Sequence, residues 1–140
     1  MDTLQCAIVL AKLGVFDREL ELRHEVAARY DALLRETRCG AVSAAPVVRP
    51  DRNSVFAQYT VMVKDRDRVQ EGLRESGIPT AVHYPVPLNE QPAYEALCCP
   101  DCTPVSRSVS RKVVSLPMHP YLASADQEQV ISALAQLDIG

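Results

Sequence analysis

Residues 55–63 alternate between apolar and mixed side chains in the manner of a half-buried β-strand. The odd-numbered positions are Val55, Ala57, Tyr59, Val61 and Val63, and the even-numbered positions are Phe56, Gln58, Thr60 and Met62. Successive side chains of a strand point to opposite faces, so the odd-numbered set shares one face. We therefore predict a strand over residues 55–63 that turns these residues toward a core.

A helix and a second strand are expected to follow. Asp65 is suited to cap a short helix that carries Val69 and Leu73 and stops at Gly77. Residues 78–84 then read as a strand, and Pro79 places it at a sheet edge or at a strand start.

The C-terminal half predicts further short elements. Residues 89–97 suggest a short helix, and residues 98–102 suggest a turn. Thr103 with Pro104 opens another helix, and residues 113–116 suit a third strand. A capping box formed by Ser124 and Gln127 predicts the start of a final helix.

The N-terminal 40 residues predict two helices that are nearly continuous. Asp2 and Gln5 form a capping box before the first, and the second follows Asp17 and fades over residues 38–40, at Arg38, Cys39 and Gly40. Both carry wide apolar faces, so we expect sequence outside this chain or a partner to cover them.

Composition narrows the class of protein. At 140 residues, with 47% apolar and 24% charged side chains, the chain is the size of one globular domain of about 100–150 residues. We predict an α+β fold with a small, roughly three-stranded sheet and packed helices.

Charge and hydropathy exclude two classes of protein. A net charge of −3 with interleaved signs argues against nucleic-acid binding. No apolar run reaches the roughly 20 residues of a membrane span. The prediction is a soluble cytoplasmic protein.

Three clustered cysteines leave two further readings open. Cys98, Cys99 and Cys102 could offer thiolates to zinc, with His119 as a fourth ligand, but no second matched pair accompanies them. A thioredoxin-like redox site ranks lower, because these cysteines are expected to follow a helix rather than a strand. We therefore assign no metal site and treat them as thiols of a surface turn.

Among the three histidines, His83 is the candidate for ligand binding. It ends a predicted strand beside Tyr84 and precedes two prolines, at Pro85 and Pro87, that stiffen the exit from the strand. His24 is expected on the solvated side of a helix, and His119 in a loop with a backbone partner.

Several segments, in order, resemble the DegT/DnrJ/StrS nucleotide-sugar aminotransferases. They are DTLQ at residues 2–5, AARY at 27–30, GIPTAVHYP at 77–85, QPAY at 91–94 and SLPMHP at 115–120. Together they span nearly the whole chain. The resemblance is nearest to enzymes that aminate a UDP-linked 3-keto acetamido-glucuronic acid for O-antigen and lipopolysaccharide sugars.

This resemblance implies a homodimeric fold-type I enzyme that uses pyridoxal 5'-phosphate, with glutamate as amino donor. Residues 1–40 would be helices that connect to a large domain, and residues 41–140 the small C-terminal domain. The family's Schiff-base lysine and most of its phosphate cup belong to the large domain. Lys12, Lys64 and Lys112 do not match the family's serine-rich lysine loop, so we expect no cofactor on this chain alone, no catalytic residue in it, and no transamination by it.

The resemblance also implies that His83 and Tyr84 bind the sugar acid of the substrate. Many family members have histidine where this chain has Asn89, which leaves a role for that position open. The alternative to an enzyme fragment is a non-enzymatic, stand-alone binding module, which zinc at the cysteine cluster could stabilise.

Overall fold

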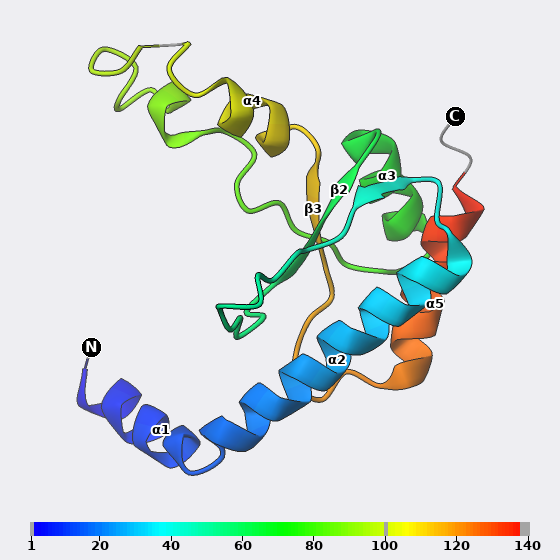
Figure 1. The fold of residues 1–140 in the computed structure, drawn as a ribbon. Helices are drawn as coiled ribbons and strands as arrows, with labels where there is room; N and C mark the ends of the chain where they lie inside the picture. The colour runs from blue at the N-terminus through cyan, green and yellow to red at the C-terminus, as the bar shows by residue number, and fades with distance from the viewer. Residues whose placement is uncertain (1, 100, 138–140) are drawn as a thin grey trace.

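The computed structural model describes residues 2–99 and 101–137, which form a three-stranded antiparallel sheet with helices packed against it (Figure 1). The elements are α1 (Thr3–Leu13), α2 (Phe16–Thr37), β1 (Val42–Ala44), β2 (Tyr59–Val63), α3 (Arg66–Glu75), the 3-10 helix η1 (Leu88–Glu90), α4 (Pro104–Ser110), β3 (Val113–Leu116) and α5 (Ser124–Gln136). The predicted α+β class and the number of strands are confirmed.

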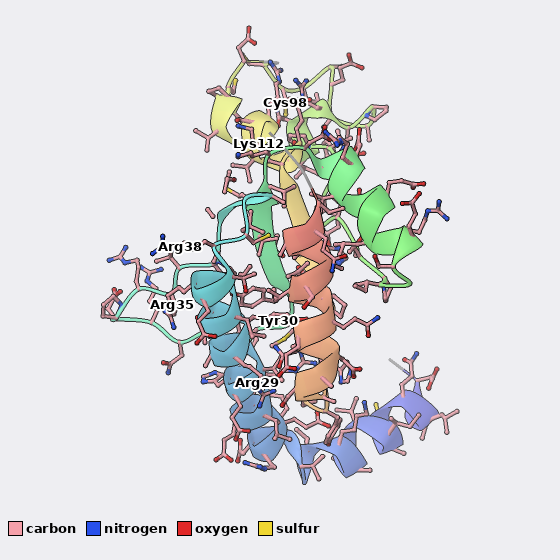
Figure 2. The ribbon with its side chains drawn as sticks, turned by 90° about the vertical axis from the view of Figure 1, so that its right-hand side faces the viewer. Arg29, Tyr30, Arg35, Arg38, Cys98 and Lys112 are labelled. Carbon is pink, nitrogen blue, oxygen red and sulfur yellow. The ribbon has the colours of Figure 1, made fainter. Side chains whose placement is uncertain are left out.

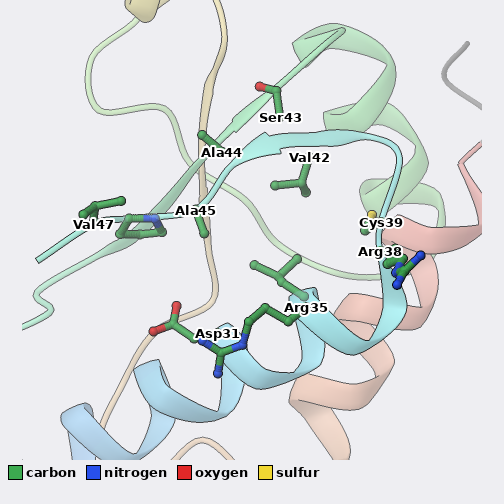
Figure 3. Close-up of a pocket in the computed structure, with 11 residues that line it drawn as sticks. Asp31, Arg35, Arg38, Cys39, Val42, Ser43, Ala44, Ala45 and Val47 are labelled. Atoms are coloured by element: carbon green, nitrogen blue, oxygen red, sulfur yellow. The ribbon is translucent and has the colours of Figure 1, made fainter.

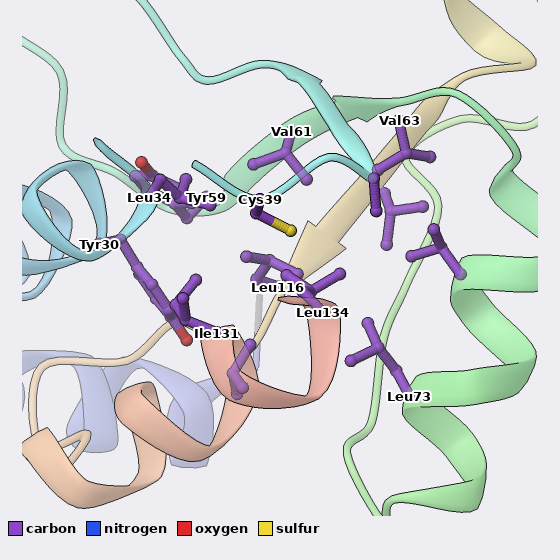
Figure 4. Packing of buried hydrophobic residues seen from close by; sticks show 14 of the residues in the cluster. Tyr30, Leu34, Cys39, Tyr59, Val61, Val63, Leu73, Leu116, Ile131 and Leu134 are labelled. Atoms are coloured by element: carbon purple, nitrogen blue, oxygen red, sulfur yellow. The ribbon is translucent and has the colours of Figure 1, made fainter. Parts of the chain in front are cut away.

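The core lies between one face of the sheet and helices α2, α3 and α5. Tyr59, Val61 and Val63 of β2 are fully buried, as their alternation predicts. Leu73 of α3 and Leu134 of α5 are also fully buried in the same cluster (Figure 4). The strand order is β1-β2-β3, so β2 is central.

The prediction of a strand over residues 55–63 is wrong for its first half, residues 55–58. The strand begins at Tyr59, and Val55 is 54% exposed. Phe56 has a φ of 44°, a left-handed conformation that a pleated strand does not accommodate. Its carbonyl accepts a 3.0 Å hydrogen bond from Nη1 of Arg23 instead of pairing with a neighbouring strand.

The predicted strand over residues 78–84 is also wrong. Only Ala81 forms a bridge there, opposite Ser115, with N···O distances of 3.2 and 2.8 Å between the two residues. Pro79 and Pro85 lack an N–H, so the ladder cannot extend far in either direction. The third strand is instead β1, for which the sequence predicts no strand.

Two predictions concerning helices in the C-terminal half need correction. Residues 89–97 hold the end of η1 and a series of turns rather than an α-helix. Gln127 does not cap α5, because its side chain is fully buried against α2. The predicted α3, α4 and β3 are confirmed, with Asp65 capping α3 through Arg68 N.

Helix α1 begins with the predicted capping box between Asp2 and Gln5 and has no buried residue. The chain turns at Gly14 and Val15, and α1 extends away from the sheet (Figure 1). Seven apolar side chains here are between 43% and 72% exposed, and we refer to them as the α1 apolar surface: Leu4, Ile8, Val9, Leu10, Leu13, Val15 and Phe16.

Helix α2 belongs to the core at its C-terminal half, where Tyr30 and Leu34 are buried. The ring of Tyr30 packs on that of Tyr59, with centroids 4.8 Å apart. The helix ends at Arg38 in the left-handed conformation, with a φ of 46°, which is the start of the predicted stop at residues 38–40.

Candidate functional site

His83 and Tyr84 lie just after the Ala81–Ser115 bridge, where the chain leaves the edge of the sheet beside β3. Both side chains are exposed, and their rings meet edge to face with centroids 5.8 Å apart. The peptide bond between them is cis. The sheet edge therefore presents an imidazole and a phenol side by side to solvent.

His83 also lines an open groove of about 360 Å³. The groove runs between residues 79–81 and residues 115–118, with Ala57 and Gln58 at its end. A neutral imidazole can donate or accept a hydrogen bond, an imidazolium donates two, and a phenol can do both. These donors suit a carboxylate or a sugar hydroxyl entering the groove.

Asn89 belongs to η1, which follows this segment in the chain. Its Oδ1 accepts a 2.8 Å hydrogen bond from Oγ1 of Thr103. Its Nδ2 is buried and has no hydrogen-bond partner among the residues that the structure describes. The amide thus retains a donor, at the position where the resemblance leaves a role open.

The segment from η1 to α4 is held together by an ion-pair network around Arg107. Nε of Arg107 lies 2.5 Å from Oε1 of Glu90, and Nη1 lies 3.4 Å from Oδ1 of Asp101. The hydrogen bond to Glu90, followed by the charge of that carboxylate, raises the pKa of Arg107. This network connects the cysteine-bearing turn to the residues that follow His83 and Tyr84.

The cysteine cluster lies on a surface turn, as predicted. Cys98, Cys99 and Cys102 are exposed free thiols. Figure 2 shows Cys98 at the far end of the molecule from Arg29. Within residues 2–99 and 101–137, no group of three His, Cys, Asp or Glu side chains is arranged to hold a metal ion.

The other two histidines have the environments that the sequence suggests. Nε2 of His24 lies 2.7 Å from the carbonyl oxygen of Ser54, and its ring meets Phe56 edge to face. Nδ1 of His119 accepts a 3.2 Å hydrogen bond from the backbone N–H of Tyr121.

A larger cavity, of about 700 Å³, lies between the end of α2 and β1 (Figure 3). Arg35 and Arg38 line it together with Asp31. The Asp31 carboxylate accepts a 2.5 Å hydrogen bond from the buried hydroxyl of Tyr59. Sequence reasoning missed this cavity, because the arginines occur singly on a helix and β1 was not predicted.

Comparison with known proteins decides the family. Residues 1–135 match the DegT/DnrJ/EryC1/StrS aminotransferase family. This chain belongs to that family. It is 45% identical over 134 residues to the UDP-2-acetamido-2-deoxy-3-oxo-D-glucuronate aminotransferase of Pseudomonas aeruginosa, a match that covers 96% of this chain and 36% of the relative.

Other members of the DegT/DnrJ/EryC1/StrS family show the same partial coverage. The dTDP-3-amino-3,6-dideoxy-alpha-D-galactopyranose transaminase of Aneurinibacillus thermoaerophilus is 33% identical, over 96% of this chain and 36% of its own length. The chain spans about a third of the length of the curated relatives that it matches.

Solved structures of family members share the fold. A DegT/DnrJ/EryC1/StrS aminotransferase from Brucella abortus superposes with a TM-score of 0.85 at 36% identity, covering 96% of this chain and 35% of that one. DesV from S. venezuelae gives a TM-score of 0.89 at 32% identity, covering 97% of this chain and 36% of that one. The similarity therefore includes α1 and α2 as well as the sheet.

The lysines in the part of the chain that the structure describes do not fit a pyridoxal phosphate site of the kind that the family implies. Lys12 on α1, Lys64 after β2 and Lys112 before β3 all have exposed side chains. A Schiff-base lysine needs a cradle for the phosphate and an acidic partner for the pyridine nitrogen. These three lysines instead lie on separate surface segments.

No helix in the described part of the chain is long and apolar enough to cross a membrane.

Proposed function

We propose that this chain is the C-terminal part of a cytoplasmic sugar aminotransferase that moves an amino group from glutamate to a UDP-linked 3-keto acetamido-uronic acid. The 45% identity over 134 residues to an enzyme named for that sugar acid is the observation that carries the proposal. Five cysteines without a disulfide suit a reducing compartment. The product would serve lipopolysaccharide and O-antigen sugar biosynthesis.

In this enzyme, His83 and Tyr84 would bind the sugar acid. Both are exposed at a sheet edge, and His83 lines a groove with room for a polar ligand. A hydrogen bond to a carboxylate is stronger than one between neutral groups, so this pair would favour an acidic sugar over a neutral one.

Pyridoxal phosphate would supply the electron sink that amino-group transfer requires. The groups that hold it would belong to the rest of the enzyme, since the three lysines here are exposed on separate segments. The work of this chain would be to bind and orient the sugar rather than to carry the reacting amine.

Residues 1–40 would connect this domain, residues 41–140, to the large domain of a homodimer. The α1 apolar surface supports this assignment, because seven apolar side chains cluster there and α1 has no buried residue. A continuous apolar patch of this kind is typical of a surface that another segment or subunit covers.

The test uses the complete enzyme and separates its two half-reactions. We expect His83→Ala to slow amination of the UDP-linked uronic acid by about tenfold to a hundredfold, because a hydrogen bond to a charged group is worth about 1.5–3 kcal/mol. The glutamate half-reaction, followed by cofactor absorbance, should change little. Tyr94→Phe is the matched control for Tyr84→Phe, because Tyr94 is also partly exposed, whereas the ring that meets His83 edge to face is that of Tyr84.

Two results would count against this proposal. Equal losses in both half-reactions would remove His83 from sugar binding. Failure of the complete enzyme to aminate any nucleotide-linked keto sugar with glutamate would overturn the function itself.

A further inference from the structure

Two residues of the cysteine cluster, Cys99 and Cys102, lie at a backbone separation that a disulfide allows. The backbone N–H of Cys102 donates a 3.3 Å hydrogen bond to the carbonyl oxygen of Cys99. Two residues joined by such an i to i+3 hydrogen bond have Cα atoms less than about 7 Å apart. Disulfides join Cα atoms about 4.4–6.8 Å apart, so this pair suits one.

The Cys99 and Cys102 side chains are neighbours on this turn, and each changes the pKa of the other. Both side chains are exposed, so a soluble oxidant can reach them.

The two thiols differ in acidity. Interaction with Cys102, followed by interaction with the Asp101 backbone, lowers the pKa of Cys99. Interaction with Cys99, followed by desolvation, raises the pKa of Cys102. The thiolate is the nucleophile in exchange reactions, so the lower pKa favours Cys99 as the first nucleophile and leaves Cys102 as the resolving thiol.

We propose that Cys99 and Cys102 are a redox-active dithiol that a low-molecular-weight disulfide such as oxidised glutathione converts into an intramolecular disulfide. This goes beyond the aminotransferase function and does not depend on it.

The exchange balances in two steps. The Cys99 thiolate attacks one sulfur of oxidised glutathione; the Cys99–glutathione bond forms, the glutathione S–S bond breaks, and one glutathione thiolate leaves and takes up a proton. The Cys102 thiolate then attacks the Cys99 sulfur, forms the Cys99–Cys102 bond and expels the second glutathione. The protein loses two electrons and two protons, and one glutathione disulfide becomes two thiols.

The position of the turn gives this oxidation a local consequence. Asp101 lies between the two cysteines in sequence and pairs with Arg107, which also pairs with Glu90 of η1. A disulfide between residues 99 and 102 would restrict the backbone that carries Asp101. The constraint would therefore act on the segment that connects the turn to the His83–Tyr84 edge.

The test is thiol counting by intact mass after incubation of the 140-residue chain in glutathione redox buffers. Free thiols are alkylated under denaturing conditions when the reaction is quenched. We expect five alkylated thiols in the reduced chain and three after oxidation. Cys98→Ser is the matched control, and we expect its number of alkylated thiols to fall from four in the reduced chain to two after oxidation.

Two further variants test the order of attack. Cys102→Ser should accumulate a mixed disulfide with glutathione on Cys99, because the resolving thiol is gone. Cys99→Ser should form no intramolecular disulfide and should react with glutathione more slowly than the parent chain.

Three outcomes would overturn the proposal. One is glutathione adducts spread evenly over the exposed thiols without a loss of two alkylation sites. Another is a disulfide that survives in Cys99→Ser, which would identify Cys98 as the partner. The third is a stoichiometric zinc ion that protects all three thiols of the metal-loaded chain, which would make the cluster a metal site.

Discussion

Gln127 of α5 accepts a 2.7 Å hydrogen bond at Oε1 from Nη1 of Arg29 on α2. Its Nε2 donates a 2.9 Å hydrogen bond to the carbonyl oxygen of Val26, one turn earlier on the same helix. The side chain is fully buried, so both ends of its amide are satisfied where water is excluded. This one glutamine joins α2 to α5.

We therefore predict that Gln127→Ala lowers the free energy of unfolding by about 1–3 kcal/mol, because it leaves the Arg29 donor and the Val26 carbonyl without that partner. Urea denaturation followed by circular dichroism measures the change. Gln129→Ala, at an exposed position on the same helix, is the matched control and should stay within about 0.5 kcal/mol of the parent. Equal effects of the two substitutions would contradict the cross-link.

Tyr59 makes the stability sensitive to alkaline pH. Burial first, and then the hydrogen bond to Asp31, raise the pKa of Tyr59 well above its usual value near 10. Above pH 10 the unfolded chain loses this proton while the folded chain keeps it, so ionisation stabilises the unfolded state. The free energy of unfolding should fall by up to about 1.4 kcal/mol per pH unit from this group, and the contribution should be constant below pH 10.

Tyr59→Phe should reduce that alkaline slope between pH 10 and 12. The same variant should also lose about 1–3 kcal/mol at pH 7, because the hydrogen bond to the Asp31 carboxylate is gone. Denaturation curves at each pH separate the two effects, and Tyr94→Phe should keep the parent slope. Parallel slopes for parent and Tyr59→Phe would show that the phenol titrates normally.

Two glycines should respond to alanine with opposite signs. Gly77 ends the α3 turn with a φ of +73°, a conformation that costs an L-residue roughly 1–2 kcal/mol. Gly77→Ala should therefore destabilise the chain by about that amount. At Gly40 φ is outside the left-handed region and nothing lies within 4 Å of an added Cβ, so Gly40→Ala should be neutral or stabilise by about 0.4–1 kcal/mol. Thermal unfolding of the two variants checks the signs, and a loss of stability in both would contradict the argument.

Two leucines distinguish the core from the α1 apolar surface. Leu134 is fully buried and Leu10 is 69% exposed. Leu134→Ala should cost about 2–5 kcal/mol in free energy of unfolding, whereas Leu10→Ala should change it by less than about 0.5 kcal/mol. Leu10→Ser should in turn weaken self-association of the chain, measured by analytical ultracentrifugation. A large stability loss from Leu10→Ala would mean that α1 packs on the domain.

Much of this fold follows from local sequence. The alternation in β2, the Asp65 cap of α3 and the capping box of α1 each depend on neighbouring residues, so period and spacing suffice to predict them. The sequence also singles out His83 and Tyr84, at the end of the strand predicted over residues 78–84 and before two prolines. That strand is wrong, but both side chains are exposed beside the Ala81–Ser115 bridge. Their role as sugar ligands remains a prediction.

The tertiary structure alone decided which segments complete the sheet and what Gln127 does. β1 pairs with β2 although its three residues carry no strong strand signal, while residues 78–84 contribute a single bridge because prolines remove the donors that a ladder needs. Gln127 occupies a capping-box position, yet its amide lies against α2, 101 residues from Val26. Hydrogen bonds and contacts between residues so far apart are set by how the whole chain packs, and neither periodicity nor spacing encodes them.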